Sequence, residues 1–245
     1  MNTLLLYIKT CCKHLKIFCL GMEYFMLGAS NCRAVAMATG RQYIYIPFFN
    51  EENISKFIQT FDSSKYPKKC VLWSNTNNLI QFKRRFPTET NDTIIHIHFK
   101  QHMKKRNKLH CIIRQTSRLI HFLILNNVEI ILISHFMRCL TQTCLCTAPE
   151  KYYFVRPLAQ KVLFQEYERI VDQTLSKHLY RFIRHIDIIK TLYEDITTKN
   201  APKNLTCNDY MLFYKEVLKD DQVHFTQEFT VCVGRFIDNL WTNRQ

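Results

Sequence analysis

Residues 22–40 read MEYFMLGASNCRAVAMATG, and this stretch decides how the first half of the chain is organised. The apolar run before Gly28 predicts a short strand, and Gly28 itself predicts a turn. Ser30 is a residue type that favours helix N-caps, and Gly40 is the type that ends helices, so a helix is expected between them. The stretch therefore predicts a strand, a turn and a helix in succession.

The same alternation of strand and helix signals continues to residue 134. Further strands are expected at 43–49, 70–73, 93–99 and 128–134, and helices at 53–61 (capped by Asn50), 77–86 and 108–125. Alternation of this kind favours an α/β fold, a mostly parallel sheet covered by helices.

The hydrophobic period changes after Pro157, where apolar residues fall three to five positions apart as far as Ile189. This spacing predicts one long helix. Thr206 and Asp209 resemble a capping box that opens a further helix, and a last helix is expected over 226–241. A boundary near residues 148 and 149 then divides a basic α/β domain (22–148) from an all-α helical domain (149–245). Residues 1–21 are interpreted as a dispensable N-terminal extension.

Positive charge is concentrated in one segment of the chain. The chain carries a net charge of +14, and the segment from Lys65 to His121 holds 13 Lys or Arg against Glu89 and Asp92, a balance of +11. Such a segment predicts a surface for nucleic acid or an acidic partner, although a solvated face that keeps the protein soluble is an open alternative. The candidate binding residues are Lys83, Arg84, Arg85, Lys100, Lys104, Lys105, Arg106 and Lys108.

The common catalytic motifs are missing. The four glycines are not spaced to cradle a phosphate, and neither G-x-S-x-G nor H-E-x-x-H occurs. No catalytic residue is nominated, and a non-enzymatic protein is expected. A divergent metal-dependent nuclease or a transferase is the alternative, for which Asp92 and Glu129 near Lys69 would supply strand-end groups. Glu166 and Glu168 are expected to face solvent.

Two groups of residues have the side-chain types of a metal site. His135, Cys139, Cys144 and Cys146 suit structural zinc, although Cys144-x-Cys146 is tighter than the usual spacing and buried cysteines also act as small hydrophobes. His96, His98 and His102 form the second group, for which a polar, basic sheet edge is the simpler interpretation. No other cofactor is expected.

The 11 cysteines are interpreted as reduced thiols of an intracellular protein, because no secretory signal is recognised. No apolar run reaches the length of a membrane span. The basic run 104–108 also suits nuclear localisation. The helical C-terminal part is expected to dock other protein subunits.

The stretch LTCNDYMLFYKEVLKDD at 205–221, with FIDNLW at 236–241, resembles herpesvirus accessory regulators of late gene expression. The resemblance covers under a fifth of the chain. It implies a nuclear, non-enzymatic factor of a viral transcription complex. Together these observations predict a regulatory or adaptor protein, with a structural virion or tegument protein as a further alternative.

Overall fold

The structure of the protein is a computed structural model. It describes residues 24–74, 81–82, 108–136, 153–154, 157–197, 199–200, 202–220 and 224–242.

A five-stranded parallel sheet forms the centre of the fold. Its strands are β1 (Phe25–Gly28), β2 (Gln42–Tyr45), β3 (Lys69–Trp73), β5 (Glu129–Ile133) and β7 (Arg181–Ile183). They lie in the order β2-β1-β3-β5-β7, and every neighbouring pair is parallel. The predicted α/β class with a helical C-terminal part is confirmed.

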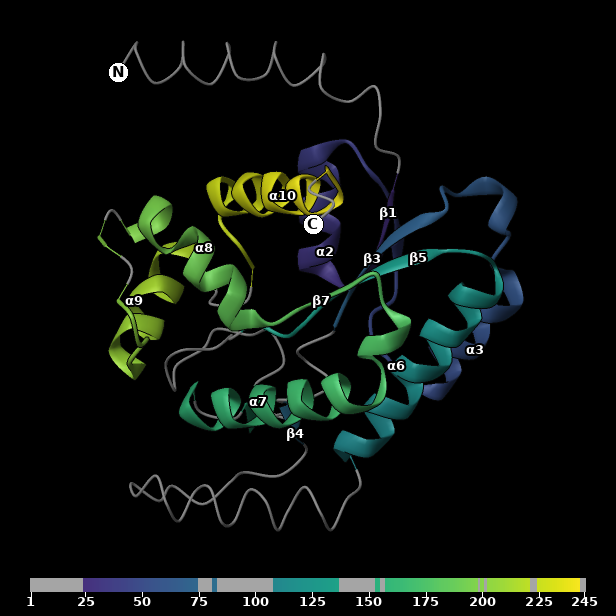
Figure 1. The fold of residues 1–245 in the computed structure, drawn as a ribbon, viewed down its shortest axis with the longest axis horizontal. Coiled ribbons are helices and arrows are strands. Elements are labelled where there is room, and N and C mark those ends of the chain that lie inside the picture. Colours follow the sequence, from purple (N-terminus) through teal and green to yellow (C-terminus); the bar gives the residue numbers. More distant parts are fainter. Residues whose placement is uncertain are drawn as a thin grey trace.

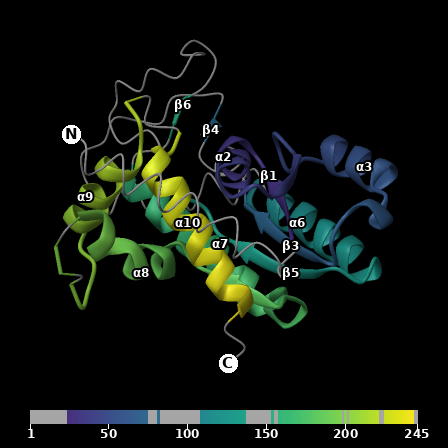
Figure 2. The same ribbon diagram turned by 90° about the horizontal axis from the view of Figure 1, so that it is seen from above.

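Helices cover both faces of the sheet (Figure 1). Helices α2 (Ser30–Thr39) and α10 (Gln227–Thr242) lie together on one face. Helices α3 (Glu51–Thr60), α6 (Lys108–Leu125) and α7 (Pro157–Thr174) cover the other. Helices α8 (His185–Thr197) and α9 (Cys207–Val217) form a pair to one side of the sheet, beside α10 in the view from above (Figure 2).

Several helix ends lie where the sequence predicts them. Asn50 caps α3 by accepting a hydrogen bond from the backbone N–H of Asn53, and Gly40 ends α2 at φ 66°. Thr206 and Asp209 form the predicted capping box of α9. The predicted N-cap of α2 is wrong by one residue, because Ser30 is the first helical residue and Ala29 holds the cap position without a side-chain bond.

The single long helix predicted from Pro157 to Ile189 is wrong. Helix α7 ends at Thr174, and the chain continues through the short 3-10 helix η2 (Ser176–His178) into β7 before α8 begins. A short apolar run such as Phe182 and Ile183 fits a helix or a strand, and the free edge of β5 decides between them. Tyr180 N–H, just before β7, donates a hydrogen bond to Ile130 O of β5 (2.9 Å), and Ile183 O of β7 accepts one from Ser134 N–H, just after β5 (3.0 Å). The sheet thus takes its last strand from beyond residue 149.

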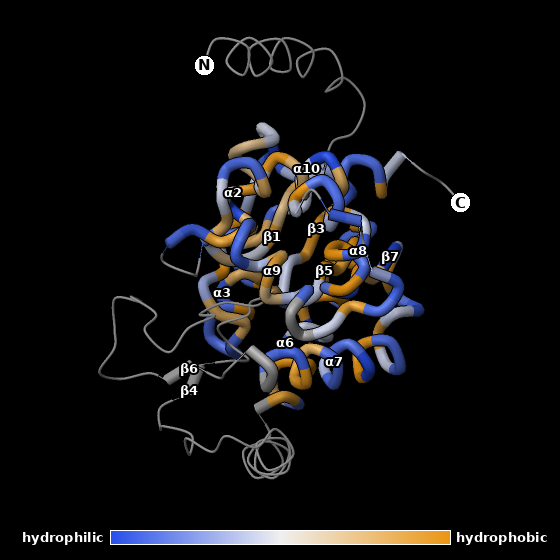
Figure 3. Tube along the Cα trace, turned by 90° about the vertical axis from the view of Figure 1, so that its left-hand side faces the viewer, coloured by the Kyte–Doolittle hydropathy of each residue, from blue (hydrophilic) through white to orange (hydrophobic). Residues whose placement is uncertain are grey.

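A second small sheet replaces part of the helix predicted at 77–86. Strand β4 (Gln81–Phe82) pairs antiparallel with β6 (Tyr153–Phe154) in a sheet of two strands. This sheet is separate from the main one, whose central strands β3 and β5 are mostly hydrophobic (orange in Figure 3). The partner strand lies about seventy residues away in the sequence, so local periodicity carries no sign of it. The strand predicted at 93–99 lies outside the described residues.

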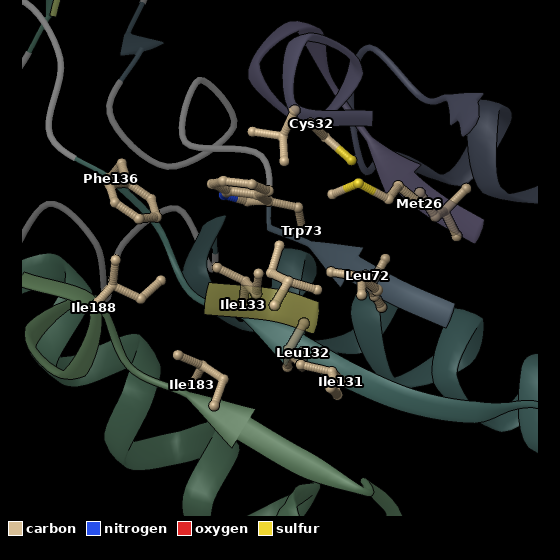
Figure 4. Packing of buried hydrophobic residues seen from close by; sticks show 14 of the residues in the cluster. Met26, Cys32, Leu72, Trp73, Ile131, Leu132, Ile133, Phe136, Ile183 and Ile188 are labelled. Atoms are coloured by element: carbon tan, nitrogen blue, oxygen red, sulfur yellow. The ribbon is translucent and has the colours of Figure 1, made fainter. Parts of the chain in front are cut away.

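An aromatic cluster joins the carboxyl ends of the central strands to α9 and α10. Phe136 follows β5, and its ring centre lies 5.4 Å from that of Trp73 at the end of β3 (Figure 4). The rings of Phe225 and Phe229 contact it from the C-terminal side at 5.3 and 6.0 Å. The last part of the chain is therefore packed on the sheet as one core.

Gly234 of α10 packs directly against Thr39 of α2. A Cβ atom at this position would lie 2.2 Å from Cγ2 of Thr39, and the Thr39 hydroxyl is held by the carbonyl of Val35. Overpacking a core contact costs about 1–3 kcal/mol, which outweighs the roughly 1 kcal/mol that alanine gains over glycine within a helix. We expect Gly234→Ala to lower the denaturant midpoint.

The Thr39→Ser background provides the control for this substitution, because serine keeps the hydroxyl and removes the methyl group that blocks the new Cβ. Gly234→Ala should be neutral or stabilising in that background. An equal loss of stability in both backgrounds would contradict the proposed contact.

None of the helices within the described ranges is long and apolar enough to cross a bilayer.

Candidate functional site

The carboxyl ends of the strands mark the place where a sheet of this order binds ligands. Strand order reverses between β1 and β3, and the helices that follow these two strands, α2 and α6, lie on opposite faces of the sheet. Ligands of open α/β sheets bind in the crevice at such a switch point. The carboxyl ends of the strands, around the switch point between β1 and β3, are therefore the candidate site.

Buried polar side chains gather where β3, β5 and β7 end. Ser74 follows β3, Ser134 and His135 follow β5, and His185 follows β7, and all four are buried. Ser134 Oγ and His185 Nε2 make no hydrogen bond within the part of the chain that the structure describes. Buried polar atoms are normally paired, so this edge differs from an ordinary apolar core.

Tyr167 of α7 links the switch point to the helix layer formed by α3, α6 and α7. Its hydroxyl lies 2.9 Å from Ser74 Oγ, and burial raises its pKa to about 12, against the opposing effect of hydrogen bonds with Ser74 and Thr116. The ring of His135 meets the Tyr167 ring edge-on, with centres 4.4 Å apart, and stacks on Phe164. These packed rings hold the ends of β3 and β5 against α7.

Glu168 and His185 form a buried pair at the end of β7. One carboxylate oxygen of Glu168 accepts hydrogen bonds from the His185 backbone N–H at 2.9 Å and from Nδ1 at 2.7 Å. Because a carboxylate only accepts, Nδ1 carries the hydrogen. Such pairing orients an imidazole, as in acid–base sites, yet the 1% exposure of His185 closes this one to a substrate. The pair joins α7 to the start of α8.

The solvent-facing position predicted for Glu168 is wrong. The Glu166 side chain is 42% exposed, in agreement with the prediction for that residue, and forms an ion pair with Arg169. Glu168 follows Phe164 by four residues and precedes Val171 by three, which places it on the buried face of α7. A carboxylate within an apolar helical stripe was the available sequence signal. No sequence signal pointed to its partner His185, which is 17 residues away.

The first turn of α2 lies directly at the switch point. Gly28, the last residue of β1, allows α2 and the end of β3 to pack closely here, since a Cβ there would lie 2.9 Å from Cys32 Cβ and 3.0 Å from the carbonyl oxygen of Trp73. The first turn of α2 contains no acidic residue. The neighbouring thiols of Cys32 and Cys70 are buried, which raises the pKa of each and keeps it protonated.

The exposed side of α6 is basic. Arg114, Arg118 and His121 are exposed at i, i+4 and i+7 and define the α6 basic face, while Ile112, Leu119 and other residues of the opposite side are buried. No Asp or Glu occurs between Lys108 and Leu125. Arg118 donates a hydrogen bond to Ser55 Oγ of α3 at 3.1 Å, which orients its guanidinium.

The predicted basic residues lie mostly beyond what the structure describes. Lys108 is the first residue of α6. The other seven are outside the described residues: Lys83, Arg84, Arg85, Lys100, Lys104, Lys105 and Arg106. The described chain leaves the carboxyl end of β3 at Ser74, and the run 104–108 leads directly into α6. The predicted basic segment and the α6 basic face are therefore continuous in sequence.

The predicted metal groups are not brought together among the described residues. His135 is buried between the Phe164 and Tyr167 rings, and its expected zinc partners Cys139, Cys144 and Cys146 lie outside the described ranges. The same holds for His96, His98 and His102. No group of three or more His, Cys, Asp or Glu residues within the described ranges could hold a metal. Structural zinc stays a prediction.

Glu129, one of the two acids suggested for a nuclease, does not lie at the switch point. Glu129 is the register partner of Lys69, as the hypothesis requires. Both residues begin their strands, so they lie at the amino-terminal ends of β5 and β3, opposite to the candidate site. Asp92 is outside the described residues. Glu129 does not belong to the candidate site.

Comparisons with known proteins assign no family. Neither the protein-family models nor the curated proteins give a match to this sequence. A function for the protein therefore has to be inferred from its fold and from the chemistry of its surface.

Alkaline pH should expose the role of the buried tyrosines. Burial raises the pKa of both Tyr167 and Tyr210 to about 12 from 10.0, so each stabilises the fold fully below pH 10. Above pH 10 the unfolded chain releases the phenol protons first, and stability falls as the pH rises toward 12. We expect Tyr210→Phe to reduce this slope in urea titrations between pH 9 and 11. An unchanged slope would contradict the shift.

Proposed function

We propose that the protein is a non-enzymatic regulatory or adaptor protein that binds nucleic acid through the α6 basic face and the basic segment before it. The observation that carries this proposal is the exposure of Arg114 and Arg118 on a helix without a single carboxylate. Cationic side chains that line one helix face release counterions from a phosphate backbone, and this drives binding.

The chain connection supports one continuous surface. The run from Lys104 to Lys108 ends where α6 begins, so in the sequence it directly precedes the helix that carries Arg114 and Arg118. α3 supports this face from the side through the Arg118–Ser55 hydrogen bond. A guanidinium held in place loses less conformational freedom on binding phosphate than a free one.

The test is a salt series of binding to labelled duplex and single-stranded DNA and RNA. The variants are Arg114→Ala with Arg118→Ala, and Lys104, Lys105, Arg106 and Lys108 together replaced by alanine. Each phosphate contact adds roughly −0.7 to −0.9 to the slope of log K against log salt, so the loss of two contacts in the first variant should reduce the magnitude of the slope by about 1.4–1.8.

Lys190→Ala with Lys215→Ala is the matched control, since it removes the same charge from α8 and α9. Binding of the control should follow the wild-type curve. No binding of the wild type at low salt would overturn the proposal and direct the search to an acidic protein partner. Equal losses in the test and control variants would show a general charge effect instead of a surface.

The enzyme alternative is tested in the same reactions. The switch point favours it by position, because ligands of this sheet order bind there. Cleavage of the labelled strands on addition of Mg²⁺ would favour the divergent nuclease over the adaptor, and intact strands would favour the adaptor. A transferase would also bind its substrate at the switch point.

The C-terminal helices are the proposed docking region for other protein subunits. The apolar stripe predicted there is core, since Leu163, Leu175 and Ile189 are buried inside the described fold. Docking would therefore use the outer faces of α8 and α9. Nuclear localisation, a role in late viral transcription and the structural virion alternative stay predictions.

A further inference from the structure

Two exposed histidines lie side by side where α6 meets the turn before β7. His121 belongs to α6 and His178 to η2, and their ring centres are 5.2 Å apart with the planes inclined at 54°. Figure 1 shows this turn, between α7 and β7, next to α6. The two residues are 57 positions apart, so the fold creates the pair.

The hydrogen bonding of His121 leaves one ring nitrogen available as a ligand. Its Nδ1 lies 2.8 Å from the carbonyl oxygen of Ser117 and 3.2 Å from the Ser117 hydroxyl. A carbonyl oxygen only accepts, so Nδ1 carries the hydrogen and Nε2 carries the lone pair. A backbone carbonyl that fixes the tautomer in this way is the usual outer partner of a metal-binding histidine.

The separation of the rings matches the geometry of two imidazoles on one ion. With metal–nitrogen bonds of about 2.0–2.1 Å, two imidazoles at adjacent positions have ring centres roughly 4.5–5.3 Å apart. The observed 5.2 Å falls in this range. Both side chains are exposed, so an ion reaches them from solvent and water completes its coordination.

We propose that His121 and His178 form a two-histidine site for a late first-row divalent metal ion. Imidazole nitrogen suits Ni²⁺, Cu²⁺ and Zn²⁺ and not Mg²⁺ or Ca²⁺. A bound ion would join α6 to η2 and add positive charge at the end of the α6 basic face. The proposal does not depend on nucleic-acid binding.

Ni²⁺ is the probe, because it does not oxidise the 11 cysteines of the chain. The full chain is treated with diethyl pyrocarbonate across a Ni²⁺ series, and modification of each histidine is read by mass spectrometry. His121 and His178 should be protected at the same Ni²⁺ concentration. His110, an exposed histidine near the start of α6, is the internal control and should not be protected in that range.

Single substitutions decide whether the two histidines act together. His178→Ala should shift protection of His121 to about 100-fold higher Ni²⁺ or more, because the second bond of a chelate forms at high effective concentration. His121→Ala should do the same to His178, and His110→Ala should change neither. Protection of His121 that is unaffected by His178→Ala would overturn the proposal, as would no protection of either residue. Both residues are exposed, so the variants should fold, as circular dichroism will check.

Discussion

Replacing Glu168 by alanine is expected to cost about 3–5 kcal/mol of folding free energy, because it removes one partner of a buried pair. Both His185 donors, the backbone N–H and Nδ1–H, would lose their acceptor inside the protein. For a chain of this size such a loss corresponds to a fall in Tm of roughly 6–20 °C. Differential scanning fluorimetry and urea unfolding measure it.

Glu166→Ala is the matched control for this substitution. Glu166 lies on the same helix and forms an exposed ion pair with Arg169, and pairs of this kind contribute little to stability. Its Tm should therefore stay close to the wild-type value. Glu168→Gln keeps an acceptor oxygen at the same place and should fall between the two. A Glu168→Ala protein as stable as Glu166→Ala would show that the buried pair is not needed for folding.

Phe136→Ala is expected to be the second severe change, at about 3–5 kcal/mol, since the cost of a deleted buried phenyl includes the cavity that it leaves. The ring is 1% exposed and contacts Trp73, Phe225 and Phe229. Loss of this ring separates the sheet edge from α10. Urea unfolding followed by tryptophan fluorescence reports it directly through Trp73.

Phe48→Ala removes the same atoms from a ring that is 40% exposed, so it should cost far less. Phe136→Leu retains most of the buried volume and should recover over half of the loss. If Phe48→Ala and Phe136→Ala had equal effects, the aromatic cluster would not be the link between the sheet and the C-terminal helices.

Local signals in the sequence were sufficient for many elements. The bounds predicted for α6, 108–125, match the structure, as do the Asn50 cap of α3 and the end of α2 at Gly40. Each depends on residues within one or two turns of each other, whose hydrogen bonds and burial are set by neighbours in the chain. The same holds for the Thr206 and Asp209 capping box.

The candidate site was much less accessible to sequence reasoning. Ser74 and Tyr167 are 93 residues apart, Glu168 and His185 are 17 apart, and neither pair belongs to a recurring motif. Their proximity follows from strand order, which periodicity does not encode. The basic residues predicted before α6 stay a prediction, whereas Arg114 and Arg118 gained significance from their exposure on one helix face.

The sequence by itself determined the α/β class, the positive charge of the middle segment and most helix ends, because composition and short-range hydrogen bonding decide these features. Only the tertiary structure decided that residues 181–183 form the fifth strand, that Glu168 is buried and that His121 meets His178. Each of these depends on a partner distant in the chain: the open edge of β5, the imidazole of His185, and the turn before β7. Hydrogen bonds and contacts between residues distant in the chain satisfy these backbone and side-chain groups, and local sequence patterns do not predict which residues will pair.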